Sequence, residues 1–171
     1  MKRMFILLLL SATASAQQIK NPVTTVVKEM LSGRQKNIVA AVEEMPADKF
    51  SYKPTADQMP FGHLVAHISE SNNLFCAKAG DVAAPKTEEA KETDGKDKLV
   101  SSLKASFDFC TTALAKADDS KLGDTIEGFG GHKQPRAWAW IALASSWADH
   151  YGAAAMYLRL NGVLPPTAQK K

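Results

Sequence analysis

Four segments of the chain carry apolar side chains at intervals of three and four residues, the spacing that aligns them along one face of an α-helix. These segments span about 22–45, 60–79, 96–117 and 136–161. Pro22 suits a first helical position after Asn21 as N-cap, and Gly162 suits the stop of the last helix. No stretch alternates convincingly as a strand would. The sequence therefore predicts an all-α fold, a four-helix bundle.

The connections between these segments differ in length and composition. The prolines within residues 46–59 indicate a connection that contains a short turn at Asp48 to Phe50. Residues 80–95 begin with Gly80, the expected stop of the second helix, and are polar and charged, so we expect a long exposed crossover. Residues 118–135 are rich in glycine and predict a loop.

The first residues, Met1 to Ala16, have the pattern of a secretory signal peptide. Lys2 and Arg3 precede an apolar run, and Ala14-Ser15-Ala16 forms a small-residue cleavage site. The run is too short to cross a bilayer as a helix, and no later stretch is long enough. We therefore expect export to the periplasm or secretion after cleavage near Ala16, without stable membrane insertion.

The mature chain is expected to form one bundle domain at 17–166, with a disordered tail at 167–171. The full sequence has a formal net charge of +3, and loss of Lys2 and Arg3 with the signal peptide reduces it to about +1. No basic patch remains that would suit a nucleic-acid partner.

Two cysteines, Cys76 and Cys110, allow one disulfide, and an oxidising compartment favours it over the alternative of two buried free thiols. Both lie towards the carboxyl ends of their helices. A bridge would therefore require the second and third helices to run parallel, because antiparallel neighbours would separate the two residues by about 20 Å. The long crossover can span that return. The expected topology is up-down-down-up.

Three histidines are candidates for a site. His63 and His67 lie one turn apart on the second helix, and His150 lies in the apolar seam of the fourth. In the expected topology the levels of His67 and His150 agree within about a turn. Each also has an ordinary structural interpretation: His63 as a surface residue, and His67 and His150 as core histidines that hydrogen-bond each other or Ser146.

Several motifs resemble the DinB/YfiT-like superfamily of four-helix bundles, in particular its exported branch. The resemblance covers about 21–166 and rests on Tyr52-Lys53-Pro54-Thr55, Phe61 to His67, His150-Tyr151-Gly152, and Tyr157 to Gly162 followed by Pro165-Pro166. Many members of that family carry a divalent metal on three histidines, and the family also has the parallel second and third helices.

Carried over by position, the family's metal ligands fall on His67, on His150 and on Ser146. Serine is a poor substitute for imidazole in binding zinc or nickel. Either His63 serves as the third ligand or a water held by Ser146 fills the place. Two imidazoles alone would bind a metal weakly, because zinc sites usually have three or four protein ligands.

Two classes of function follow. One is an exported, metal-dependent enzyme with zinc or nickel at His63, His67 and His150, acting as a hydrolase on an unassigned small molecule; thiol transfer, also linked to the family, is disfavoured by export. The alternative is a non-catalytic binding or structural bundle with a degenerate metal site. The family often forms dimers, so the resemblance also implies a homodimer.

Overall fold

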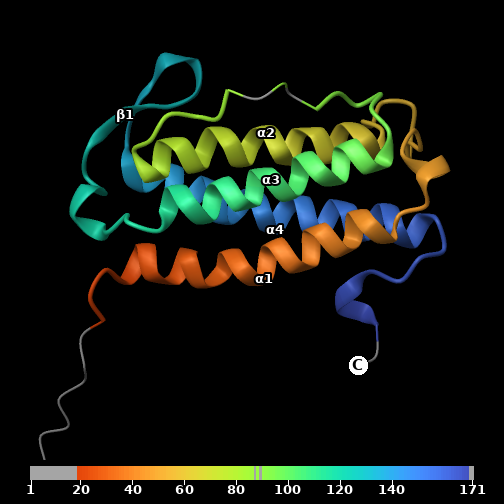
Figure 1. Cartoon of the computed structure of the whole chain (residues 1–171), viewed down its shortest axis with the longest axis horizontal. Coiled ribbons are helices and arrows are strands. Elements are labelled where there is room, and N and C mark those ends of the chain that lie inside the picture. The colour runs from red at the N-terminus through yellow and green to blue at the C-terminus, as the bar shows by residue number, and fades with distance from the viewer. Residues whose placement is uncertain (1–18, 87, 89, 170–171) are drawn as a thin grey trace, which may run out of the picture.

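The computed structural model describes residues 19–86, 88 and 90–169 (Figure 1). The predicted signal peptide, Met1 to Ala16, lies outside the described residues. Within the described part of the chain, no helix is both long enough and apolar enough to cross a membrane.

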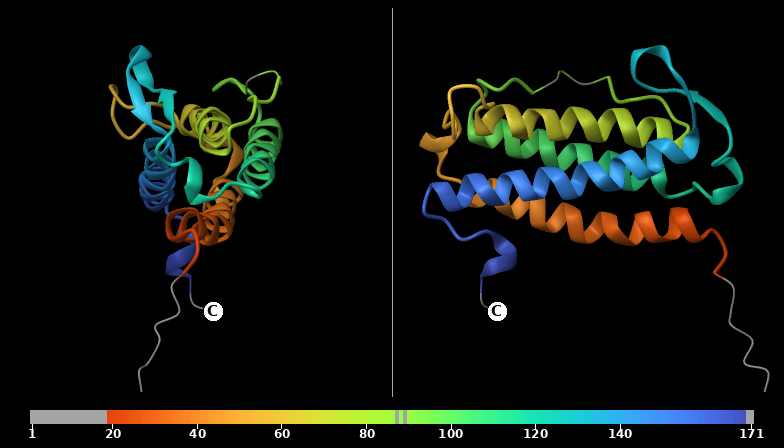
Figure 2. Two further views of the ribbon diagram at one scale, coloured as in Figure 1. Left: turned by 90° about the vertical axis from the view of Figure 1, so that its left-hand side faces the viewer. Right: turned by 180° about the vertical axis from the view of Figure 1, so that it is seen from behind.

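Four α-helices make up the bundle, and their bounds are α1 Pro22–Glu44, α2 Phe61–Gly80, α3 Lys96–Leu114 and α4 Arg136–Leu160. α1 and α4 run in one direction and α2 and α3 in the other, while the crossover returns along the outside of α2 and α3 (Figure 1). In the end-on view of Figure 2, α1 and α2 lie diagonally opposite; α2 packs on α3 and α4, and α1 packs on the same two helices. The predicted up-down-down-up bundle is confirmed.

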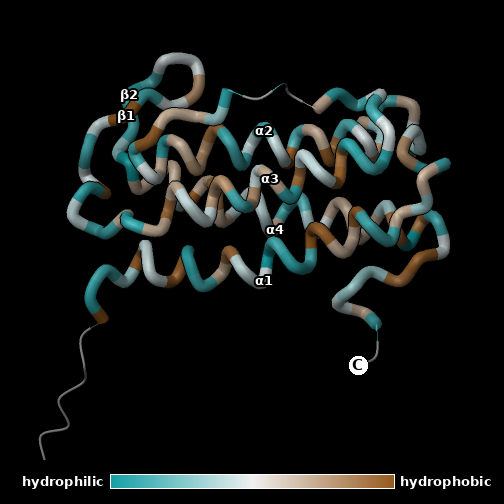
Figure 3. Tube along the Cα trace, viewed as in Figure 1, coloured by the Kyte–Doolittle hydropathy of each residue, from teal (hydrophilic) through white to brown (hydrophobic). Residues whose placement is uncertain are grey.

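Hydrophobic and hydrophilic residues alternate along every helix (Figure 3). The core forms where the four apolar faces meet. Trp140, Trp147 and Phe107 are among its largest fully buried side chains. One polar group lies among them: Asn72 of α2 is 1% exposed, donates to the Ser106 hydroxyl of α3 at 3.0 Å, and accepts from the Trp147 indole nitrogen of α4 at 2.8 Å. A single amide thus connects three helices.

The glycine-rich loop contains a feature that the sequence analysis missed. Strands β1 (Thr125–Glu127) and β2 (Lys133–Pro135) form an antiparallel hairpin, with Ile126 opposite Gln134. At three residues each, the strands are too short to show an alternating pattern. At the tip, the Phe129 ring packs edge-on against Trp138 of α4 and Phe75 of α2, which holds the hairpin on the bundle.

The amino terminus of α1 is capped differently from expectation. Asn21 occupies the N-cap position but adopts a left-handed backbone conformation, and its side chain makes no capping bond to the helix. Instead the Asp119 carboxylate, from the connection after α3, accepts the Val23 and Thr24 amides at 3.0 and 2.9 Å. The Asn21 side-chain oxygen in turn accepts the Asp119 amide. A remote residue therefore satisfies the free amides of the first turn.

The chain continues beyond α4 along the side of the bundle. Residues 167–169, which we expected to be part of a disordered tail, belong to or directly follow a 3-10 turn at Pro166–Ala168. The Thr167 hydroxyl bonds to that of Tyr151 at 2.8 Å, and Gln169 donates to the Glu44 carboxylate at 2.9 Å. Lys170 and Lys171 lie outside the described residues.

The carboxyl end of α2 is held tightly against α3. Cys76 and Cys110 form the disulfide, with Cα atoms 5.1 Å apart. One turn further on, a Cβ at Gly80 would collide with the backbone carbonyl of Ala113. The absence of a side chain at Gly80, the last helical residue, therefore allows α2 to approach α3 closely. Asp81 takes the left-handed position that ends α2. Gly162 has that role after α4, with a φ of 74°.

Replacing Gly80 by alanine is expected to lower the free energy of unfolding by roughly 1–3 kcal/mol, because the added methyl group meets backbone that cannot move aside. The matched control is Gly33→Ala on α1, where nothing lies within 4 Å of the added Cβ. That change should raise the free energy of unfolding by about 0.5–1 kcal/mol through higher helix propensity. Urea denaturation followed by circular dichroism measures both, and equal effects at the two positions would contradict the packing argument.

Candidate functional site

The structure brings His67 and His150 together between α2 and α4. Their ring centroids are 5.1 Å apart and the rings meet edge to face. His67 is exposed and His150 half-buried, so His150 is less enclosed than its place in the apolar seam indicates. Burial, and to a smaller extent the neighbouring His67, lower the pKa of His150 to about 4, against a weaker opposing effect of Asp149. His150 is therefore a neutral imidazole at pH 7.

Ser146 lies one turn before His150 on the same helix. Its hydroxyl and the Nδ1 atom of His150 share a hydrogen bond of 3.1 Å, so the residue-146 side chain points at the histidine pair. On α2, the Ser71 hydroxyl lies 3.5 Å from the Nε2 atom of His67, which is the long limit for a hydrogen bond. Each imidazole thus has a serine of its own helix as its neighbour.

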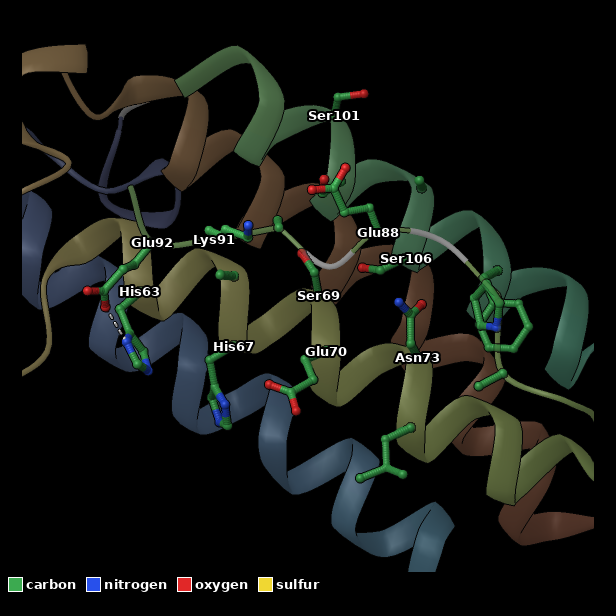
Figure 4. Close-up of a pocket in the computed structure, with 18 residues that line it drawn as sticks. His63, His67, Ser69, Glu70, Asn73, Glu88, Lys91, Glu92, Ser101 and Ser106 are labelled. Atoms are coloured by element: carbon green, nitrogen blue, oxygen red, sulfur yellow. Dashed lines mark hydrogen bonds and ion pairs between the residues drawn. The ribbon is translucent and has the colours of Figure 1, made fainter. Parts of the chain in front are cut away.

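His63 pairs with a residue of the crossover and not with the other two histidines. Its Nδ1 atom lies 2.6 Å from a carboxylate oxygen of Glu92, which belongs to the crossover, and both side chains are about half exposed (Figure 4). The pair ties the crossover to the start of α2. A third imidazole is therefore not gathered with those of His67 and His150.

These residues do not fit the metal centre that the family resemblance implies. Zinc and nickel are held in proteins by three or four side chains, whereas two imidazoles and the Ser146 hydroxyl meet here. Among the described residues, no group of three or more His, Cys, Asp or Glu side chains is placed to hold a metal ion. We therefore derive no chemical step through a bound metal.

A second feature adjoins the histidine pair, where α2 meets α3. A groove of about 740 Å³ runs between α2 and α3 beneath the crossover. Its floor includes Ser69, Asn73 and Ser106, which lie together under the crossover in Figure 4. His63 and His67 line one end of it. The sequence analysis missed this groove, because single serines and asparagines on a helix carry no distinctive pattern.

The fourth histidine and several large aromatic side chains take no part in the histidine pair. His132 is exposed in the hairpin. The Tyr157 hydroxyl donates to the Met59 carbonyl at 2.6 Å and anchors α4 to the connection before α2. Burial, with a smaller contribution from Tyr52, raises the pKa of that hydroxyl. Trp140 and Trp147 are fully buried, as packing residues should be.

Comparisons with known proteins agree with this architecture. The model of the DinB superfamily matches residues 30–153. Among solved structures, the DinB-like protein YjoA of Bacillus subtilis is 22% identical with a TM-score of 0.68, over 85% of this chain and 99% of that one. A DinB-like protein of Bacillus cereus is 13% identical with a TM-score of 0.67, over 82% of this chain and 93% of that one. No curated protein matches the chain.

Proposed function

This chain belongs to the DinB superfamily, and on that premise we propose that it is an exported, non-catalytic binding bundle whose metal site is degenerate. One observation carries the proposal. At the position of the family's third ligand the chain has Ser146, whose hydroxyl is bonded to His150 at 3.1 Å. A hydroxyl in that place leaves two imidazoles, which is one ligand too few for a stable zinc or nickel centre.

Export is part of the same proposal. The apolar run and small-residue cleavage pattern before Gln17 support it, and so does the disulfide between Cys76 and Cys110, because such bonds persist in oxidising compartments. The partner we propose is a small molecule, with neither nucleic acid nor stable membrane insertion involved. A homodimer remains compatible with this function.

A second candidate is the metal-dependent hydrolase, and one observation favours it. The His67 and His150 rings lie 5.1 Å apart between centroids, close enough for two imidazole nitrogens to share an ion at about 2 Å per bond. In that case water would complete the coordination at Ser146. The two candidates differ in metal content, which is directly measurable.

Replacing Ser146 by histidine is expected to create the missing site. The mature protein, purified without a histidine tag, should contain zinc and nickel well below one ion per chain. Ser146→His should bind zinc at least about tenfold more tightly, because a third imidazole would join His67 and His150. Titration with zinc against a competing chelator, together with elemental analysis, measures both quantities.

Ser145→His is the matched control, since residue 145 is exposed and points about 100° away around α4. It should leave zinc affinity unchanged. One zinc or nickel ion per wild-type chain, lost in His67→Ala, would overturn the proposal and support the hydrolase. No gain in Ser146→His would show that the histidine pair is not the remnant of a metal site.

A further inference from the structure

The groove between α2 and α3 has the size of a small-molecule site. Its volume is about 740 Å³, within the usual range for ligand pockets of roughly 300–1,000 Å³. Along α2 its lining extends from His63 to Leu74, a length of about 16 Å at 1.5 Å per residue. Residues of the crossover, among them Pro85, Glu88 and Glu92, complete the lining, so a ligand there would touch three segments of the chain.

The floor of the groove offers hydrogen-bond acceptors. Ser69 and Ser106 are 6% and 2% exposed, and their hydroxyl protons are already donated to the carbonyls of Val65 and Leu103. With their protons already donated, the two hydroxyl oxygens can act towards a ligand only as acceptors. The Ser106 oxygen also accepts the Asn72 amide at 3.0 Å, which leaves it one further acceptor position. The side-chain oxygen of Asn73 is buried and has no partner among the described residues. A buried acceptor without a donor is costly, and a ligand that carries N–H groups would satisfy it.

The charge of the lining also favours a cation. Glu70, Glu88 and Glu92 line the groove against a single lysine, Lys91 (Figure 4). Glu92 is held by His63 at 2.6 Å, whereas Glu70 and Glu88 have no ion-pair partner within 4 Å among the described residues. The lining of the groove therefore carries two carboxylates, of Glu70 and Glu88, that a positive ligand could pair with.

The end of the groove nearest the disulfide is apolar. Leu74 of α2 and Phe109 of α3 line it, together with Pro85 of the crossover, and all three are half-buried. An ammonium group on the floor would leave the rest of its molecule to contact these side chains. The groove thus has a polar, acidic part and an apolar part along one axis.

We propose that this groove binds a small organic cation, a primary amine with an apolar or aromatic body. The ammonium group donates to Asn73 and the two serines, and the body packs on Leu74 and Phe109. The inference rests on the proposed binding function, to which it adds a site and a ligand class, but it does not depend on the state of the histidine pair.

Benzylamine, benzyl alcohol and benzoate test the proposal, because they share a ring and differ in charge. Isothermal titration of the mature protein at pH 7 should give saturable binding of benzylamine, at least tenfold weaker binding of the alcohol, and none of benzoate. Amide NMR shifts should localise the change to Ser69, Asn73 and Ser106. No saturation by benzylamine at tens of millimolar, or equal binding of all three, would overturn the proposal.

Asn73→Leu should weaken benzylamine binding at least tenfold, and Ser69→Ala, a gentler change, should weaken it severalfold. Asn37→Leu on α1, which is not part of the groove lining, should leave it unchanged. Melting curves of each variant check that it folds. Unchanged affinity in both groove variants would contradict the assignment. A wild-type protein that contains a bound metal would refute only the proposal of a degenerate metal site. Failure to prefer benzylamine over the alcohol and benzoate would refute only the proposal that the groove binds an amine.

Discussion

Replacing both Cys76 and Cys110 by alanine is expected to lower the free energy of unfolding by about 4 kcal/mol, because the bridge closes a loop with a sequence separation of 34 residues. That loop contains the whole crossover. The disulfide joins two helices that run parallel, so without it the return segment must be ordered entirely by packing and by contacts such as that between His63 and Glu92. Urea denaturation of the oxidised wild type and of the double variant measures the difference.

The dependence of unfolding on urea concentration gives an independent readout. A cross-linked denatured chain is more compact, so its slope with urea should be smaller than that of the alanine variant. The wild type under reducing conditions is the matched control and should resemble the variant. Equal free energies of unfolding, each obtained as the product of slope and midpoint, for the oxidised and reduced wild type would show that the bridge contributes nothing to stability.

The fold could be predicted from sequence where one pattern extends over many residues. The intervals of three and four predicted all four helices, and the two cysteines indicated that α2 and α3 run parallel. Features formed by a few residues were not predictable in the same way. The hairpin strands Thr125–Glu127 and Lys133–Pro135 are three residues each, and the cap on α1 comes from Asp119, far away in sequence.

The candidate site was predictable only in part, for a similar reason. Helix register placed His67 and His150 at one level, and their rings do meet. The partner of His63 is Glu92 on the irregular crossover, whose path no periodic pattern determines. The floor of the groove depends on which serine protons are already donated to helix carbonyls, and only coordinates provide that information.

Replacing Trp147 by alanine is expected to destabilise the bundle by roughly 3–5 kcal/mol, the usual cost of removing a buried aromatic side chain. Trp147 is fully buried, packs against Phe107 of α3, and donates its indole proton to Asn72 at 2.8 Å. The variant therefore loses apolar contacts and leaves a buried amide oxygen without its donor. Thermal and urea unfolding should both show the loss, while far-ultraviolet circular dichroism confirms that the helices still form.

Trp147→Phe separates the two contributions. Phenylalanine keeps much of the apolar contact but cannot donate, so its cost of about 1–3 kcal/mol would come mainly from the unpaired oxygen of Asn72. Combining Trp147→Phe with Asn72→Leu removes both partners, and the double variant should be less destabilised than the sum of the single changes by about 0.5–3 kcal/mol. Strict additivity would mean that the indole and the amide are not coupled, and that apolar packing rather than this hydrogen bond holds α4 against α2 at this level.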